Sequence, residues 1–222
     1  GFWLWVLYGN KDPKGYEALP TVSGKPEFGG RLQYPILGGE LAGTCHFRRV
    51  DGDALFIRDY WEERLALDGQ WDIGIGLWFE AVFQHSEFEP LFPMLMPVGL
   101  PYEWTKMITL GADYTFDLGN GLYTRVEHMA TVMSEDPFGW NEDAHVSAFS
   151  LSHPMGAMDS LLAIGYYAWE QKAYAQYIRW QRTYDNLDLS VGLFYYPDTI
   201  GTGAPLGQSN ASEGYGAQLM VI

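Results

Sequence analysis

Cysteine is almost absent from this chain: Cys45 is the only one among 222 residues. A single thiol can form neither an internal disulfide nor the set of thiolate ligands of a structural zinc site. There is also no run of the ~20 apolar residues that a membrane-spanning helix requires. Charged residues make up only 18% of the chain, and 13 Lys and Arg face 28 Asp and Glu. The net charge of −15 argues against a nucleic-acid partner, because phosphate binding requires clustered basic side chains.

Aromatic residues and glycine, in contrast, are plentiful. Aromatics form 16% of the chain, with nine Trp and fifteen Tyr, and there are 26 Gly. This composition suits a β-barrel with aromatic girdles and many tight turns. A soluble β-sandwich or a lipocalin-like barrel has a similar composition, so composition alone does not separate these folds.

Short and long connections alternate along the chain. Tight turns are expected at 37–39, 67–70, 118–121, 154–157 and 184–186, and longer, irregular stretches at 10–26, 85–102, 134–143 and 196–212. Transmembrane β-barrels have short turns at one end, long loops at the other, and strands of about ten residues between them. The chain shows this rhythm over its whole length.

The segments between the turns predict about twelve strands and no helix. They lie near 2–9, 27–36, 40–50, 54–66, 70–84, 103–117, 121–133, 144–152, 159–169, 172–184, 187–196 and 213–222. The clearest alternation runs from Trp71 to Gln84, which predicts Ile73, Ile75, Leu77 and Phe79 on one face and Asp72, Gly74, Gly76 and Glu80 on the other. The triplet Glu62-Glu63-Arg64 places a charge on each face, which predicts a bulge or a site near a membrane interface.

This organisation resembles that of bacterial outer-membrane β-barrel proteins of the porin-like type. The resemblance is architectural and covers residues 1–222, and the final strand has the amphipathic pattern of such barrels but ends in Ile222 rather than in an aromatic residue. The opening Gly1-Phe2-Trp3, without Met, leads us to expect a mature or truncated chain. The resemblance implies a single all-β domain, a transmembrane antiparallel up-and-down β-barrel of about twelve strands, in a bacterial outer membrane. Its partners would be membrane lipid and small solutes or ions, with no cofactor.

Charged residues on the faces opposite the apolar stripes are expected to line the lumen, because a basic residue facing lipid at the membrane midplane costs about 2–4 kcal/mol. They form either a network that braces the wall or an ion-selective constriction, and the two roles are compatible. A lumen of twelve strands lies between a filled eight-stranded interior and the open channel of about 16–18 strands. We therefore expect a narrow, mixed-charge channel lined by Arg31, Arg48, Asp72, Glu80, Asp113, Arg125, Glu127 and Arg179.

The segment 87–101 is unusually apolar and contains four prolines. It either folds onto the mouth of its own barrel or forms a contact surface for another protein or a lipid. In the second case the chain would be a non-conducting barrel that anchors an assembly. The contact residues would be Phe88, Leu91, Phe92, Met94, Leu95 and Met96.

Signals for catalysis and metal binding are weak, so neither an enzyme nor a metal site is expected. His145-Val146-Ser147 resembles the His-x-Ser pair of outer-membrane lipases but lacks the Asn-Gly that follows the serine there. It leaves a membrane-embedded hydrolase as a third alternative. Asp51-Gly52-Asp53 resembles a fragment of a calcium loop, and a tight turn explains it better.

Overall fold

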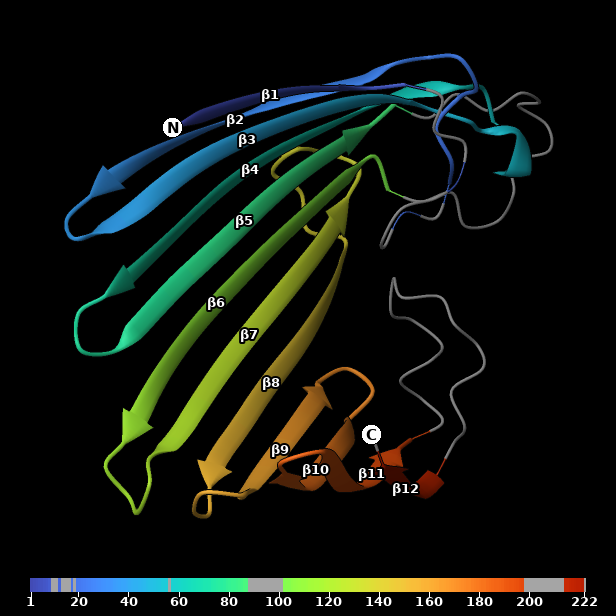
Figure 1. The fold of residues 1–222 in the computed structure, drawn as a ribbon. Coiled ribbons are helices and arrows are strands. Elements are labelled where there is room, and N and C mark those ends of the chain that lie inside the picture. The colour runs from blue at the N-terminus through green and yellow to red at the C-terminus, as the bar shows by residue number, and fades with distance from the viewer. Residues whose placement is uncertain are drawn as a thin grey trace. The chain divides into compact units, whose positions relative to one another are not determined.

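The structure is a computed structural model that describes residues 1–8, 12, 17, 19–55, 57–87, 102–197 and 214–221. Twelve antiparallel strands form one sheet in which each strand lies beside its neighbours in sequence (Figure 1). The strands are β1 (Phe2–Leu7), β2 (Glu27–Ile36), β3 (Gly39–Val50), β4 (Tyr60–Asp72), β5 (Gly76–Ser86), β6 (Trp104–Phe116), β7 (Leu122–Ser134), β8 (Glu142–Pro154), β9 (Asp159–Ala168), β10 (Ala173–Tyr184), β11 (Leu187–Tyr196) and β12 (Gly214–Val221). A single short 3-10 helix, η1 (Asp53–Leu55), is the only helical element within these ranges.

The all-β prediction and the number of strands are confirmed, as is the up-and-down order of neighbours. Closure of the sheet into a barrel is not observed: among the described residues no pairing joins β1 to β12. None of the helical structure in the described part of the chain is long and apolar enough to cross a membrane.

The β4–β5 hairpin differs from the sequence prediction. A turn was expected at 67–70, but β4 continues through these residues and pairs with β3 as far as Trp71. The chain turns instead at Ile73-Gly74-Ile75, where Gly74 has a positive φ of 90° and its N–H donates to Asp72 Oδ1 (3.1 Å). The run 70–84 is therefore two strands and a turn. Ile73 and Ile75, which were predicted to lie within a strand, belong to that turn.

The expected bulge at Glu62-Glu63-Arg64 is also absent, since β4 pairs with β3 in a continuous register from Tyr60 to Trp71. This register places Glu62 opposite Arg48 and Arg64 opposite His46, while Glu63 lies opposite Phe47 on the other face. The register thus brings Glu62 opposite a guanidinium, whereas Arg64 lies opposite a histidine and contacts Glu62 and Glu17 instead. The third charge of the triplet, Glu63, is exposed.

The chain divides into two compact units, which we describe separately. Unit 1 comprises residues 1–71, 79–108 and 130–143, and unit 2 comprises residues 72–78, 109–129 and 144–222. Unit 1 contains β1 to β4, apart from Asp72 at the end of β4, with one end of β5, β6 and β7. Unit 2 contains the other ends of those three strands and β8 to β12, apart from the first two residues of β8.

In unit 1 the two faces of the sheet differ sharply. Directly opposite residues of antiparallel strands share a face, so the printed registers define both faces. One, the apolar face of unit 1, exposes large side chains to solvent: Phe2, Leu4, Val6, Phe28, Leu32, Tyr34, Leu65 and Leu67. The other, the polar face of unit 1, carries Arg31, His46, Arg48, Glu62, Arg64 and Asp68.

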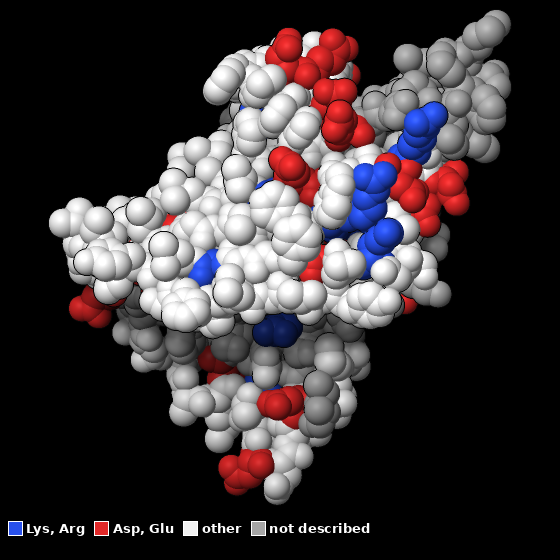
Figure 2. Space-filling model, turned by 90° about the horizontal axis from the view of Figure 1, so that it is seen from above, with Lys and Arg blue, Asp and Glu red and all other residues white. Residues whose placement is uncertain are grey.

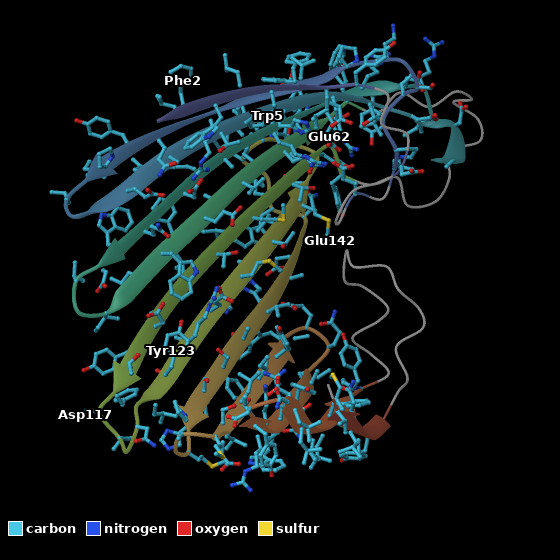
Figure 3. The ribbon with its side chains drawn as sticks, viewed as in Figure 1. Phe2, Trp5, Glu62, Asp117, Tyr123 and Glu142 are labelled. Atoms are coloured by element: carbon cyan, nitrogen blue, oxygen red, sulfur yellow. The ribbon has the colours of Figure 1, made fainter. Side chains whose placement is uncertain are left out.

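The figures show the same separation. Phe2 lies on the outer side of β1, while Trp5 and Glu62 lie on the inner side (Figure 3). Seen from above, where β1 and β2 are uppermost in Figure 1, the surface is mostly uncharged. The blue and red groups lie in separate clusters among the uncharged residues (Figure 2).

In unit 2 the alternation is similar but less strict. Its apolar face exposes Phe149, Leu151, Leu161, Tyr174, Ile178, Val191, Leu193, Tyr215, Leu219 and Val221. The opposite face, the polar face of unit 2, carries Arg179, Gln181, Ser190 and Gln218, but Tyr166 and Phe194 share it. This alternation follows from the period of two residues with which side chains of a strand point to opposite faces.

Aromatic rings cover glycines on neighbouring strands in both units. Four directly opposite pairs have this arrangement: Trp5 with Gly29, Trp71 with Gly39, Phe149 with Gly165 and Phe194 with Gly216. A Cβ at Gly165 would lie 2.2 Å from Phe149 Cε1. The glycines therefore provide the space in which the rings lie flat on the sheet, a cross-strand device that also fixes the register.

Candidate functional site: a charge network on the polar face

The most strongly bonded polar group of unit 1 is built around Arg48, whose side chain is 2% exposed. Its Nε donates to Glu62 Oε1 (2.7 Å) and its Nη2 to Glu62 Oε2 (3.2 Å). Its Nη1 lies 2.8 Å from Glu17 Oε2. Arg64 contacts the same two carboxylates, at 2.5 Å from Glu62 Oε1 and 3.3 Å from Glu17 Oε1. Two guanidinium groups and two carboxylates thus neutralise one another in a buried cluster.

Glu17 reaches this cluster from the connection between β1 and β2. The nearby chain is held against the end of β3 by a Thr21–Val50 bridge and by a hydrogen bond from Arg48 Nη1 to the Leu19 carbonyl oxygen (3.1 Å). Leu19 packs on the small core of Val50, Ile57 and Tyr60. The described part of this connection therefore lies across the polar face of unit 1.

A second acidic group, Glu27, adjoins the cluster at the start of β2. It is 1% exposed, it accepts a hydrogen bond from Thr21 Oγ1 (2.5 Å), and its Oε2 lies 3.4 Å from His46 Nε2. Gln84 of β5 donates to Glu62 Oε2 (3.2 Å). The connected polar side chains thus come from four neighbouring strands, β2 to β5, and from Glu17, and all lie on the polar face of unit 1.

Nearer the tight-turn end of β2, the charges are more exposed. Arg31 binds Asp68 through both Nη atoms, at 2.6 and 2.7 Å, and also donates to Thr44 Oγ1 (3.0 Å). Both charged side chains are more than a quarter exposed. Gln33 donates to Glu40 beside them.

Unit 2 has its own polar group on β5, β6 and β7. Arg125 lies over the Trp78 ring, with Cζ 4.6 Å from the ring centroid, and it is paired with Glu127. Trp78 Nε1 donates to the same carboxylate (3.2 Å). An added Cβ at Gly76 would lie 2.6 Å from Asp113 Oδ1, so this carboxylate lies directly against the backbone of β5.

Of the eight residues expected to line a lumen, the printed registers place Arg31 and Arg48 on the polar face of unit 1 and Arg179 on the polar face of unit 2. Arg125 is paired with Glu127. Arg31 and Arg48 are paired instead with Asp68, Glu62 and Glu17. Asp72 and Glu80 are exposed, and the buried Nε of Arg179 has no hydrogen-bond partner within the described ranges. The predicted contact residues Phe88, Leu91, Phe92, Met94, Leu95 and Met96 lie outside the described residues.

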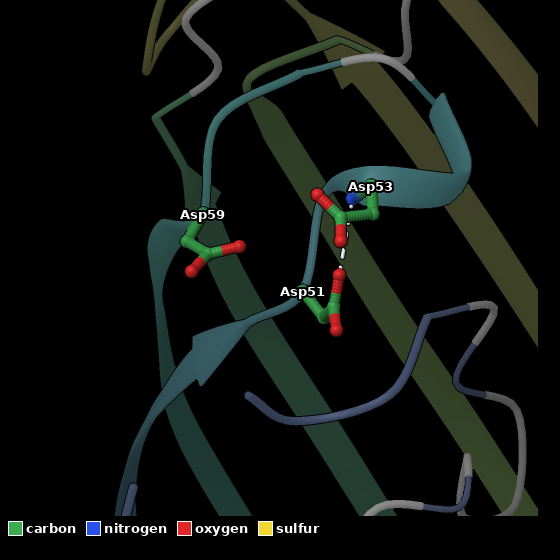
Figure 4. A group of neighbouring side chains, drawn as sticks. All are labelled: Asp51, Asp53 and Asp59. Atoms are coloured by element: carbon green, nitrogen blue, oxygen red, sulfur yellow. Dashed lines mark hydrogen bonds between the residues drawn. The ribbon is translucent and has the colours of Figure 1, made fainter. Parts of the chain in front are cut away.

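Three carboxylates gather at the connection between β3 and β4. Asp51, Asp53 and Asp59 each offer an oxygen within 4.8 Å of the others (Figure 4). Backbone N–H groups already bind two of them: Asp53 N donates to Asp51 Oδ1 (3.0 Å) and Gly52 N to Asp59 Oδ1 (3.4 Å). The bond from Asp53 N to Asp51 Oδ1 fits the turn that the sequence predicts there. The sequence did not predict that Asp59 lies beside these two carboxylates, because it follows the short helix η1.

Unit 1 also contains an apolar cavity of about 590 Å³, lined by residues that include Leu65, Phe83, Ile108, Val132 and Trp140. Lys106 also lines it, and its ammonium donates to Ser134 Oγ (3.0 Å) and to the carbonyl oxygens of Pro137 and Gly139. The connection between β7 and β8 is thereby held against the sheet.

Comparisons of the chain with protein-family models, with curated proteins and with solved structures found no match.

Proposed function

We propose that this chain is an outer-membrane β-barrel whose polar face encloses a narrow channel for the passive passage of small solutes or ions. The observation that supports it best is the division of the sheet in unit 1. Phe2, Leu4 and Leu32 are 76%, 81% and 68% exposed on one face, while Arg48 and Glu62 are 2% and 3% exposed on the other. A sheet in water buries its apolar face and exposes its charges. The inverse arrangement suits lipid outside and a polar interior.

The charge network supports a narrow channel rather than a wide one. Arg48, Arg64 and Glu62 project from the wall, and Glu17 lies across them. Mixed charge of this kind gives only a weak preference among ions. The excess of acidic residues would concentrate cations at the channel mouth, an effect that salt screens over about 10 Å at 0.1 M.

Closure of the sheet is part of the proposal and has a direct test. We expect a cysteine introduced at Leu4 in β1 to crosslink with one introduced at one of the alternating positions Leu219 or Val221 in β12, in a Cys45→Ser background. The measurement is the yield of intramolecular crosslink in the protein inserted in vesicles. A pair with Leu4→Cys and Leu161→Cys in β9, which lies inside the sheet, is the matched control. Crosslinking only between separate molecules would reject a barrel formed by one chain.

Conductance in planar bilayers tests the channel itself. We expect slight cation selectivity that fades as ionic strength rises, because screening removes the effect of the acidic groups. The double variant Glu80→Gln/Asp113→Asn should shift the reversal potential toward anions. Glu63→Gln, which removes one negative charge from the apolar face of unit 1, should leave it unchanged.

Two results would contradict the channel. Strong anion selectivity in the unmodified protein would mean that its acidic groups do not control the ion path. Absence of conductance in a correctly inserted protein would favour the alternative, a non-conducting barrel that anchors an assembly through segment 87–101.

A further inference from the structure

Four side chains with polar atoms, those of Ser147, His128, His145 and Trp169, meet on the face of unit 2 that also exposes Phe149. Ser147 Oγ lies 2.9 Å from His128 Nδ1 and accepts a hydrogen bond from Trp169 Nε1 at 2.9 Å. On the far side of the imidazole, His128 Nε2 lies 3.3 Å from His145 Nδ1, and the two rings stack with centroids 5.4 Å apart. The residues come from β7, from β8 and from the turn after β9.

The donors and acceptors form a consistent chain. The indole of Trp169 can only donate, so it binds an oxygen lone pair of Ser147 and leaves the hydroxyl hydrogen available for His128 Nδ1. A neutral His128 that accepts there carries its hydrogen on Nε2, which points toward His145 Nδ1. A hydroxyl, a base and a group that orients the base are the three parts of an activated serine nucleophile.

The surroundings indicate the class of substrate. Ser147 lies directly opposite Tyr167, whose ring packs edge-on against Trp169 at 5.0 Å, and Phe149 is the next residue of β8 on the same face. Phe149 and Trp169 are about half exposed. An acyl chain can lie along these rings, and an indole commonly lies at the boundary of membrane and water, where hydrolytic water is present.

We propose that Ser147 is the nucleophile and His128 the general base of an esterase site for acyl esters of membrane amphiphiles. The membrane origin of the substrate rests on the proposed lipid-facing orientation of this face, whereas the nucleophile and base do not. Ser147 Oγ bonds to the ester carbonyl carbon as its proton passes to His128 Nδ1. The bond from that carbon to the alkoxy oxygen then breaks, and the leaving alkoxide takes the proton from His128. Water, deprotonated by the same nitrogen, releases the carboxylic acid and restores the serine.

The experiment uses the full chain in detergent micelles, a fluorophosphonate probe, and p-nitrophenyl esters of short and long acyl chains. We expect the probe to attach to Ser147, as located by mass spectrometry, and Ser147→Ala to abolish both labelling and hydrolysis. Loss of general-base catalysis in His128→Gln should reduce kcat by about 10²–10⁴-fold. Ser150→Ala, which removes a hydroxyl from the opposite face of β8, should leave both unchanged.

His145 is proposed as a positioning residue, and its variants separate that role from a purely structural one. His145→Ala should lower kcat with KM unchanged, and His145→Asn, whose side-chain oxygen can accept the same hydrogen bond, should restore part of the loss. Equal labelling of the unmodified protein and of Ser147→Ala, or none in a protein with intact β-sheet circular dichroism, would overturn the proposal. Labelling in micelles does not depend on conductance, so failure of the channel and failure of the esterase are distinguishable.

Discussion

Replacing Arg48 by Ala should lower the free energy of unfolding by about 3–5 kcal/mol, since removing one partner of a buried ion pair leaves the other charge uncompensated. Glu62 is 3% exposed, and the side chain of Glu17 is 6% exposed. Both lose a guanidinium contact in this variant. Arg64 still contacts both carboxylates, but one cation then faces two anions.

The measurement is equilibrium unfolding in denaturant, with the refolded protein in one lipid or detergent system throughout. The matched control is Arg31→Ala, which breaks a bidentate but partly exposed pair with Asp68, and which should cost about 0.2–1 kcal/mol. The double variant Arg48→Met/Glu62→Leu should recover much of the loss, because apolar replacements leave fewer buried charges without a partner. A loss below that of Arg31→Ala would show that the network is not buried in the folded protein.

Much of the fold could be predicted from the sequence because strand alternation and turn composition are local. β2 and β11 have the predicted bounds, 27–36 and 187–196, and the other strands except β4 and β5 differ from prediction by at most two residues at either end. In β2 and β11, a run of alternating apolar and polar residues ends at residues typical of a tight turn or loop, which marks the end of the strand. The separation of charged from apolar faces follows directly from that period.

The β4–β5 hairpin was mispredicted because a local turn signal competed with a register set by β3. Asp68-Gly69 is a common hairpin pair in isolation. In the structure Asp68 binds Arg31 of β2, and Gly69 lies opposite Leu41, where an added Cβ would meet the Trp71 ring at 2.5 Å. The contacts of Asp68 with Arg31 and of Gly69 with Leu41 join residues far apart in the sequence, so the neighbouring residues do not reveal them.

The ion pairs were only partly predictable for the same reason. The face of each charge follows from its own strand, but its partner depends on the register between strands and on loops such as that of Glu17. The Ser147–His128 contact is a further example. The His145-Val146-Ser147 triplet was visible in the sequence. The imidazole that lies against the Ser147 hydroxyl, however, belongs to His128, 19 residues away on β7.

Replacing Leu32 by Arg should destabilise the membrane-inserted protein by about 2–4 kcal/mol, the range for a basic residue facing lipid at the midplane. Leu32 lies near the centre of β2 and is 68% exposed on the apolar face of unit 1. In a water-soluble protein, an exposed substitution of this kind usually changes stability by less than about 0.5 kcal/mol. The two environments therefore predict different results for the same residue.

Two matched variants sharpen the comparison. Gln33→Arg places the same charge on the next residue of β2, on the polar face beside Glu40, and should have little effect. Ile36→Arg, at the end of the strand on the same face as Leu32, should cost only about 0–1 kcal/mol because the penalty falls toward the interface. Unfolding free energies measured in vesicles of one composition give all three values. Equal, small effects at Leu32 and Gln33 would place the apolar face in water and overturn the membrane orientation, while a graded loss from Ile36 to Leu32 would locate the midplane of the membrane along β2.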